Sequence, residues 1–138
     1  VSGSSSKKIN LGVSLIKPVS SGYTITSRFG SRESIRTSGH RGLDIAAPKG
    51  TPIKAAAAGT VTTSGYSGTY GYMIKISHGN GVETVYAHCS QLNVSKGQSV
   101  SQGQVIGKVG STGRSTGPHL HLEIRVNGVL YNPQNYVY

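Results

Sequence analysis

The chain has 138 residues and a mass of 14.4 kDa, which suits one domain that buries about two thirds of its unfolded surface. It carries 14 basic and 4 acidic residues, a net charge of +10, with 20 glycines and no tryptophan. We expect no membrane span, because no apolar run reaches about 18 residues. A single cysteine excludes an internal disulfide and a four-thiolate zinc site, so any metal must use histidine and carboxylate ligands.

The positive charge predicts attraction to polyanions, among which anionic wall polymers are candidates. The basic residues are scattered from Lys7 to Arg125, instead of lying on one helix or alternating with stacking aromatic residues. This distribution matches no nucleic-acid-binding module, so we expect no nucleic-acid partner.

The N-terminal residues 1–15 are predicted to be a linker or an irregular segment, because Ser, Gly and Lys dominate their first half without periodicity. Residues 16–138 are predicted to form the domain. In this domain β-branched runs alternate with Gly, Pro, Asn and Ser. The pattern predicts strands at 23–27, 53–56, 60–63, 72–77, 83–88, 105–109 and 120–126.

Asn80-Gly81 lies between two of these runs and is the strongest hairpin signal in the chain. It predicts that 72–77 pairs with 82–88. Turn signals recur at intervals of about 8 to 15 residues, and no segment shows a convincing helical period. We therefore predict an all-β fold, an antiparallel sandwich or barrel-like sheet with little or no helix.

The first fragment that suggests chemistry contains His40 and Asp44. Nearby glycines and a proline predict an irregular loop that leads into a strand. Imidazole nitrogen and carboxylate oxygen both bind zinc well, and a catalytic zinc needs three protein ligands and one open position. His40, Asp44 and one histidine of the last long strand satisfy that number. The alternative is a loop ion pair of Asp44 with Arg41 or Lys49.

The second fragment ends the predicted strand 83–88 with a histidine. Strand alternation places His88 on the face of Tyr86, opposite Val85 and Ala87. A histidine at a strand end can give or accept a proton. Alone, however, it is more often a satisfied structural residue.

Two neighbouring residues are predicted to be structural. His78, beside the hairpin turn, is expected to hydrogen-bond locally. Alternation turns Cys89 away from His88, so we interpret it as a small apolar residue of the core. A cysteine nucleophile is the alternative.

The third fragment is the alternating run 119–126. Its odd-numbered residues share one face, and the apolar residues between them share the other. The residues of the polar face are His119, His121, Glu123 and Arg125. The Cα atoms of His119 and His121 are expected roughly 6.5 to 7 Å apart, so both imidazoles can enter one small site. Glu123 either orients a ligand imidazole or pairs with Arg125 at the rim, and a solvent-exposed face with incidental histidines is the alternative for the whole run.

Together the three fragments resemble the M23 family of zinc metallopeptidases, the lysostaphin and LytM type, over about 16–138. The family pattern is H-x-x-x-D, a histidine in a Y-x-H strand, and H-x-H. These positions are filled here by His40, Asp44, His88, His119 and His121. Further matching segments are 28–30, 47–52, 110–113, 118–119 and 132–133.

The resemblance implies the LytM-type fold and a division of roles among these five residues. His40, Asp44 and His121 would hold Zn2+, and His88 and His119 would stand beside the open coordination position. His119 is then the general base. His88 stabilises the developing oxyanion or protonates the leaving amine, and the two roles can be exchanged.

The resemblance also implies an enzyme that cuts peptide cross-links of bacterial peptidoglycan. Glycyl-glycine members carry a Gly-rich stretch before the first zinc histidine, whereas 34–38 of this chain contains no glycine. This favours the D-alanyl-diaminopimelate bond, with the glycyl-glycine bond as the alternative. Arg32 or Arg36 can then pair with a diaminopimelate carboxylate.

The implied setting is extracellular or cell-wall associated, as a monomer, within a larger secreted protein or a phage tail or lysin protein. Two other classes stay open. One is a non-catalytic wall-binding or regulatory module of the same fold. The other is a biotinyl- or lipoyl-type carrier domain, suggested by the strand rhythm of 94–110. A carrier needs a modifiable lysine on an exposed hairpin, typically beside a methionine, and Met73 is far from the lysines of 94–110.

Overall fold

The computed structural model describes residues 4–5, 15–19, 24–27, 43–79, 81–111, 117–127 and 129–131. These ranges contain one short 3-10 helix, η1 (Gly68–Tyr70), and eleven strands. The strands are β1 (Ser4–Ser5), β2 (Thr24–Ser27), β3 (Leu43–Ala46), β4 (Pro52–Lys54), β5 (Gly59–Tyr66), β6 (Tyr72–Gly79), β7 (Val82–Leu92), β8 (Ser99–Val100), β9 (Val105–Val109), β10 (His119–Val126) and β11 (Val129–Tyr131). No helix within the described ranges is long and apolar enough to cross a membrane.

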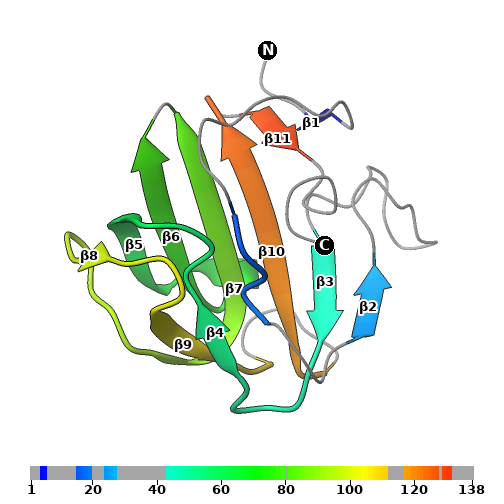
Figure 1. Cartoon of the computed structure of the whole chain (residues 1–138). Helices are drawn as coiled ribbons and strands as arrows, with labels where there is room; N and C mark the ends of the chain where they lie inside the picture. The colour runs from blue at the N-terminus through cyan, green and yellow to red at the C-terminus, as the bar shows by residue number, and fades with distance from the viewer. Residues whose placement is uncertain are drawn as a thin grey trace.

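The strands form one branched sheet (Figure 1). Its main path runs β1-β11-β10-β7-β6-β5-β8, while β3 also pairs with β10, β2 with β3, and β9 with both β7 and β4. Among the described strands, only the short pairing of β1 with β11 is parallel. The predicted all-β antiparallel fold is therefore confirmed.

The hairpin prediction is confirmed as well. β6 pairs antiparallel with β7, and Ser77 is opposite Glu83. In the connection, Gly81 has a φ of 75°, a left-handed value that glycine adopts without strain. The predicted strand at 60–63 is longer in the structure. It forms β5, which continues to pair with β6 as far as the last residue of β5.

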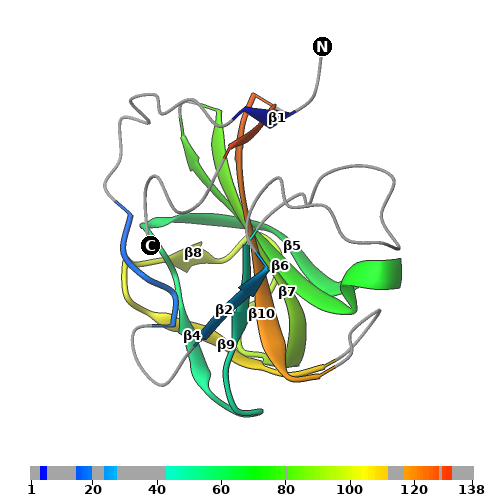
Figure 2. The same ribbon diagram turned by 90° about the vertical axis from the view of Figure 1, so that its right-hand side faces the viewer.

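Alternation along β10 separates the two faces of the sheet. Leu120 and Leu122 are fully buried in the main core, together with Ile45 of β3 and Tyr86 of β7. Figure 2 shows β4, β9 and the segment 15–19 on one side of the sheet and η1 on the other. The polar residues of β10 point to the η1 side, where they contact a side chain of η1.

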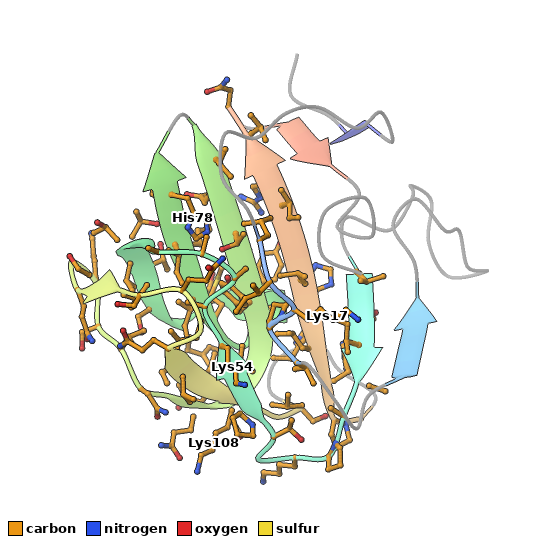
Figure 3. All side chains as sticks on the ribbon, in the orientation of Figure 1. Lys17, Lys54, His78 and Lys108 are labelled. Carbon is orange, nitrogen blue, oxygen red and sulfur yellow. The ribbon has the colours of Figure 1, made fainter. Side chains whose placement is uncertain are left out.

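His78, labelled in Figure 3, begins a chain of hydrogen bonds that enters the core. Its Nδ1 lies 2.9 Å from Ala58 O, and its Nε2 lies 2.8 Å from Thr84 Oγ1. The Thr84 oxygen is 2.8 Å from Tyr86 Oη, which also accepts the backbone N–H of Ala56 at 3.0 Å. The predicted local hydrogen bonding of His78 is thus present.

When His78 is neutral, the hydrogen bonds of this chain can run in one direction only. Ala58 O can only accept, so Nδ1 carries the hydrogen and Nε2 accepts from the Thr84 hydroxyl, which leaves Tyr86 to donate to Thr84. A second proton, on Nε2, would reverse the bond between His78 and Thr84, so that the hydroxyl hydrogen of either Thr84 or Tyr86, both fully buried, would lose its acceptor. Burial lowers the pKa of His78 from its ordinary 6.5, although the Ala58 bond and the charge of Glu83 act in the opposite direction.

Acid should therefore destabilise the fold through His78. Because the folded-state pKa lies below the unfolded value, the contribution of His78 is complete above pH 6.5 and is lost as the pH falls through the lowered pKa. Between about pH 7 and about pH 5, the free energy of unfolding of the wild type should fall more than that of His78→Gln, which cannot titrate. Urea denaturation of both proteins at the two pH values measures this. Equal losses would show that His78 does not carry the effect.

Candidate active site

β10 lies between β3 and β7, and this position brings its histidines next to Asp44. The register aligns His121 with Asp44 on β3 and with Ala87 on β7. His119 is aligned with Ala46, two residue pairs further along β3. Side chains from segments far apart in the sequence therefore meet at the start of β10.

The carboxylate of Asp44 is central to this group. Its Oδ1 lies 2.9 Å from His121 Nδ1 and 3.8 Å from His119 Nε2. The side chains of Asp44, His121 and His119 are 13%, 9% and 15% exposed. The group is thus largely buried but still in contact with solvent, as a site that receives a substrate must be.

His88 reaches the site through an irregularity of β7. Between two register pairs of β6 and β7, at Tyr72 and at Ile74, β7 has two residues where β6 has one. His88 lies in this bulge with a φ of 62°, a left-handed value that is uncommon outside glycine. The expectation that His88 shares the face of Tyr86 is wrong, because the extra residue sends Tyr86 and Cys89 to the core and His88 to the opposite side.

The ring contacts of His88 show where the bulge directs it. Its centroid lies 4.7 Å from the ring of His119 and 6.0 Å from that of His121, and the residue is 7% exposed. Backbone strain of this kind clusters at functional sites. The structure thus brings together four of the five predicted metal and catalytic residues.

The ring of His119 is oriented by the backbone. Its Nδ1 lies 2.9 Å from the carbonyl oxygen of Gly117, and a carbonyl can only accept, so Nδ1 carries a hydrogen. In the neutral ring Nε2 is then a proton acceptor. Nε2 is also the nitrogen of His119 that lies 3.8 Å from Asp44 Oδ1. The bond to Gly117 thus fixes which nitrogen of the neutral His119 ring can accept a proton.

Glu123 is fully buried next to His121. Its Oε2 accepts hydrogen bonds from His121 Nε2 at 2.8 Å and from the Tyr70 hydroxyl at 2.7 Å. Its Oε1 accepts from Nε and Nη2 of Arg125 at 2.9 and 2.6 Å. The sequence left open whether Glu123 contacts a ligand imidazole or pairs with Arg125. In the structure Glu123 contacts both His121 and Arg125, and it does so in the interior instead of at a rim.

Tyr70 is a residue of the site that no sequence pattern predicts. It belongs to η1, outside the strand alternation, and packs against Val85 and Ala87 on the face of the sheet that carries His121. Its ring centroid is 5.9 Å from that of His121. Only the tertiary packing of the 66–72 connection brings it there, so no local signal could have found it.

The contacts shift the pKa values of His121 and Glu123 apart. Burial acts to lower the pKa of His121, but the hydrogen bonds and charges of Asp44 and Glu123 outweigh it and raise this pKa to about 9. Burial acts to raise the pKa of Glu123, but His121, Tyr70 and Arg125 together lower it to about 2. The two carboxylates that flank the ring thus favour the protonated form of His121, and His121 in turn favours the ionised form of Glu123.

The remaining predicted residues lie outside the described ranges. These are the proposed ligand His40 and the proposed substrate-binding residues Arg32 and Arg36, which stay predictions. Within the described ranges, no group of three or more His, Cys, Asp or Glu side chains is placed to hold a metal ion. The two described members of the predicted ligand set nevertheless fit a divalent cation, because an anionic oxygen and an imidazole nitrogen face each other at 2.9 Å.

Cys89 belongs to the core, as predicted. It is fully buried, and burial raises the pKa of its thiol to about 12. A thiol in this state supplies almost no thiolate at neutral pH, which argues against a cysteine nucleophile.

Comparison with known proteins identifies a family that this chain matches. The model of peptidase family M23 matches residues 38–133. The DD-carboxypeptidase/endopeptidase Mpg of Neisseria meningitidis is 56% identical over 94 residues, which are 68% of this chain. The chain spans only 22% of the length of that relative.

Solved structures agree with this match. A zinc-containing peptidase from Vibrio cholerae has a TM-score of 0.82 at 34% identity, covering 87% of this chain and 39% of the other. A chain of the SpoIIQ–SpoIIIAH pore-forming complex has a TM-score of 0.81 at 30% identity, covering 90% of both chains. From the family model, the relative and the site geometry we conclude that the chain belongs to peptidase family M23.

Proposed function

We propose that this chain is a zinc-dependent endopeptidase that hydrolyses peptide cross-links of bacterial peptidoglycan. The observation that carries the proposal is the meeting of Asp44, His88, His119 and His121 at one end of β10. A structural role for these histidines would need neither the strained backbone of His88 nor the packing of its ring against those of His119 and His121, the two histidines beside Asp44. A metal site with adjoining proton-transfer groups accounts for both.

His40, Asp44 and His121 are the proposed ligands. Asp44 Oδ1 and His121 Nδ1 supply one oxygen and one nitrogen on neighbouring strands. Zinc, when bound, supplies Lewis acidity that lowers the pKa of water to about 7 and polarises the scissile carbonyl.

Two histidines of the chain would transfer protons during the reaction. His119 accepts a proton from the attacking water at Nε2, while its Nδ1–H bond to Gly117 keeps the ring in place. His88, 4.7 Å away between ring centroids, donates a proton to the leaving amine or a hydrogen bond to the oxyanion.

The bond that we propose is D-alanyl-diaminopimelate. The name of the Neisseria relative, a DD-carboxypeptidase/endopeptidase, supports this choice. Arg32 or Arg36 is proposed to bind a diaminopimelate carboxylate.

Digestion of two kinds of cell wall tests the choice of bond. Mass spectrometry should find cross-linked fragments of diaminopimelate-type walls cut at the D-alanyl bond, because the cationic side chains of Arg32 and Arg36 favour a carboxylate-bearing stem peptide. Glycine-bridged walls should stay intact under the same conditions. New amino-terminal glycines in the second digest would establish the glycyl-glycine alternative instead.

A non-catalytic module is the second candidate function, because a chain of the SpoIIQ–SpoIIIAH complex is similar over 90% of its length. The proton-accepting Nε2 of His119 and the bulge at His88 favour the enzyme, since a purely binding module requires neither. Zinc-loaded protein that binds both walls and cuts neither would favour the module.

The net charge of +10 is proposed to concentrate the protein on anionic wall polymers, in an extracellular or wall-associated setting. Lys54 and Lys108 belong to β4 and β9, which cover the side of the sheet opposite η1 (Figures 2 and 3). Adsorption through these lysines therefore leaves the site accessible.

Binding to intact sacculi should weaken as salt rises, because the Debye length falls from about 10 Å at 0.1 M to about 3 Å at 1 M. Cleavage of a short soluble peptide should barely change, since the chemistry acts over bond lengths. Sedimentation with sacculi and a soluble peptide assay measure the two quantities. The double variant Lys54→Gln, Lys108→Gln should imitate high salt in the first assay only. Equal salt sensitivity in both assays would contradict adsorption by charge.

A further inference from the structure

The buried carboxylate of Glu123 is surrounded by hydrogen-bond donors. Its two oxygens accept four bonds of 2.9 Å or shorter, from His121, Tyr70 and Arg125. An ionised carboxylate in the interior needs such compensation, and the Arg125 guanidinium supplies the opposite charge. Glu123 therefore acts as an acceptor toward every one of these partners.

The bonds divide between the two oxygens in a consistent way. Arg125 occupies Oε1 with two of its nitrogens, which leaves Oε2 to His121 and Tyr70. Arg125 Nη2 also donates to the Tyr70 oxygen at 3.3 Å, so the Tyr70 hydrogen must point to Glu123. The orientation of Glu123 is thus fixed from two sides, by β10 itself and by η1.

This arrangement decides which nitrogen of His121 carries a hydrogen. A carboxylate oxygen 2.8 Å from Nε2 requires a hydrogen on that nitrogen, so Nε2 has no lone pair for a cation. The other nitrogen, Nδ1, faces Asp44 Oδ1 at 2.9 Å. Nδ1 is therefore the nitrogen of His121 that can bind a cation, and it lies beside a second donor, the oxygen of Asp44.

We propose that Glu123 is a positioning residue that makes Nδ1 the metal-binding atom of His121, and that Arg125 and Tyr70 hold Glu123 for this purpose. The inference rests on the proposed zinc function. It assigns to three residues outside the ligand set a measurable part of the metal affinity.

Metal substitution in the wild type provides the first test. In protein labelled with nitrogen-15 histidine and loaded with cadmium-113, scalar coupling to cadmium should appear at Nδ1 of His121. Its Nε2 should carry a hydrogen with a one-bond nitrogen–hydrogen coupling. Coupling of cadmium to Nε2 of His121 would overturn the proposal, whatever the variants do.

The second test compares zinc affinities by competition with a chromogenic chelator. Glu123→Gln should bind zinc about 10- to 100-fold more weakly, the usual effect of losing a partner of a ligand histidine. Tyr70→Phe should weaken binding in the same direction and by less, because it removes one of the four bonds to Glu123. If Glu123→Gln does not fold, the zinc affinity of Tyr70→Phe and the cadmium spectrum of the wild type still test the proposal.

Glu83→Gln is the matched control. Glu83 lies on β7 opposite Arg125 in the register, so this variant removes the same charge from the same part of the sheet without touching His121. Its zinc affinity should equal that of the wild type. A Glu123→Gln affinity equal to that of Glu83→Gln would refute the inference alone, whereas a wild type that binds neither zinc nor cadmium would refute the proposed function with it.

Discussion

Asp44→Ala and His121→Ala should each leave the protein without bound zinc and without hydrolysis of peptidoglycan. Each variant removes one of three proposed ligands, and two protein ligands fall below the number that a catalytic zinc site uses. The zinc content after desalting, measured by plasma mass spectrometry, should fall from about one ion per chain to near zero. Release of soluble fragments from sacculi should fall to background.

The control for these variants is His78→Gln. It also removes an imidazole, but one whose hydrogen bonds lie with Ala58 and Thr84, away from Asp44. It should keep both zinc and activity, and circular dichroism shows whether each variant is folded. Stoichiometric zinc in Asp44→Ala or His121→Ala would refute the ligand assignment.

Where local pattern alone determines structure, the sequence predicted it correctly. Asn80-Gly81 between two β-branched runs sufficed for the hairpin of β6 and β7, because a tight turn pairs its own flanking strands. The alternation of 119–126 sufficed to separate Leu120 and Leu122 from the histidines, because side chains of a regular strand alternate between faces.

The irregular part of the site could not be predicted in the same way. A single extra residue in a strand reverses every side chain that follows it, and nothing in 83–88 announces the bulge at His88. The sequence therefore placed His88 on the wrong face, although its membership of the site was inferred from the family pattern. The surroundings of His88 therefore depend on how β7 pairs with its neighbouring strands, and no pattern within β7 itself determines that pairing.

The partners of Glu123 show a second limit. Arg125 lies two positions away on the same strand face, so the sequence could propose that contact. Tyr70 lies 53 positions away, and only the packing of η1 against the sheet brings its hydroxyl to Glu123. Without Tyr70, a sequence-based account cannot tell a buried carboxylate from one at a rim.

His88→Ala and His119→Ala should show the opposite combination to the ligand variants, with zinc retained and activity lost. Neither side chain is a proposed ligand, but both rings lie within 4.7 Å of each other beside Asp44 and His121. Loss of a proton-transfer group should reduce kcat/KM on a soluble cross-linked peptide roughly a hundredfold or more. Loss of the metal from both variants would place these residues among the ligands and overturn the mechanism.

His88 needs a further variant, because alanine is strained at its φ of 62° and could disturb the bulge itself. Asparagine tolerates the left-handed region and keeps an N–H donor, but it cannot transfer a proton. If His88 protonates the leaving amine, His88→Asn should be as slow as His88→Ala. Activity partly restored by asparagine would assign His88 to stabilising the oxyanion. An asparagine variant as active as the wild type would show that the bulge, and not the imidazole, is what the reaction requires at this position.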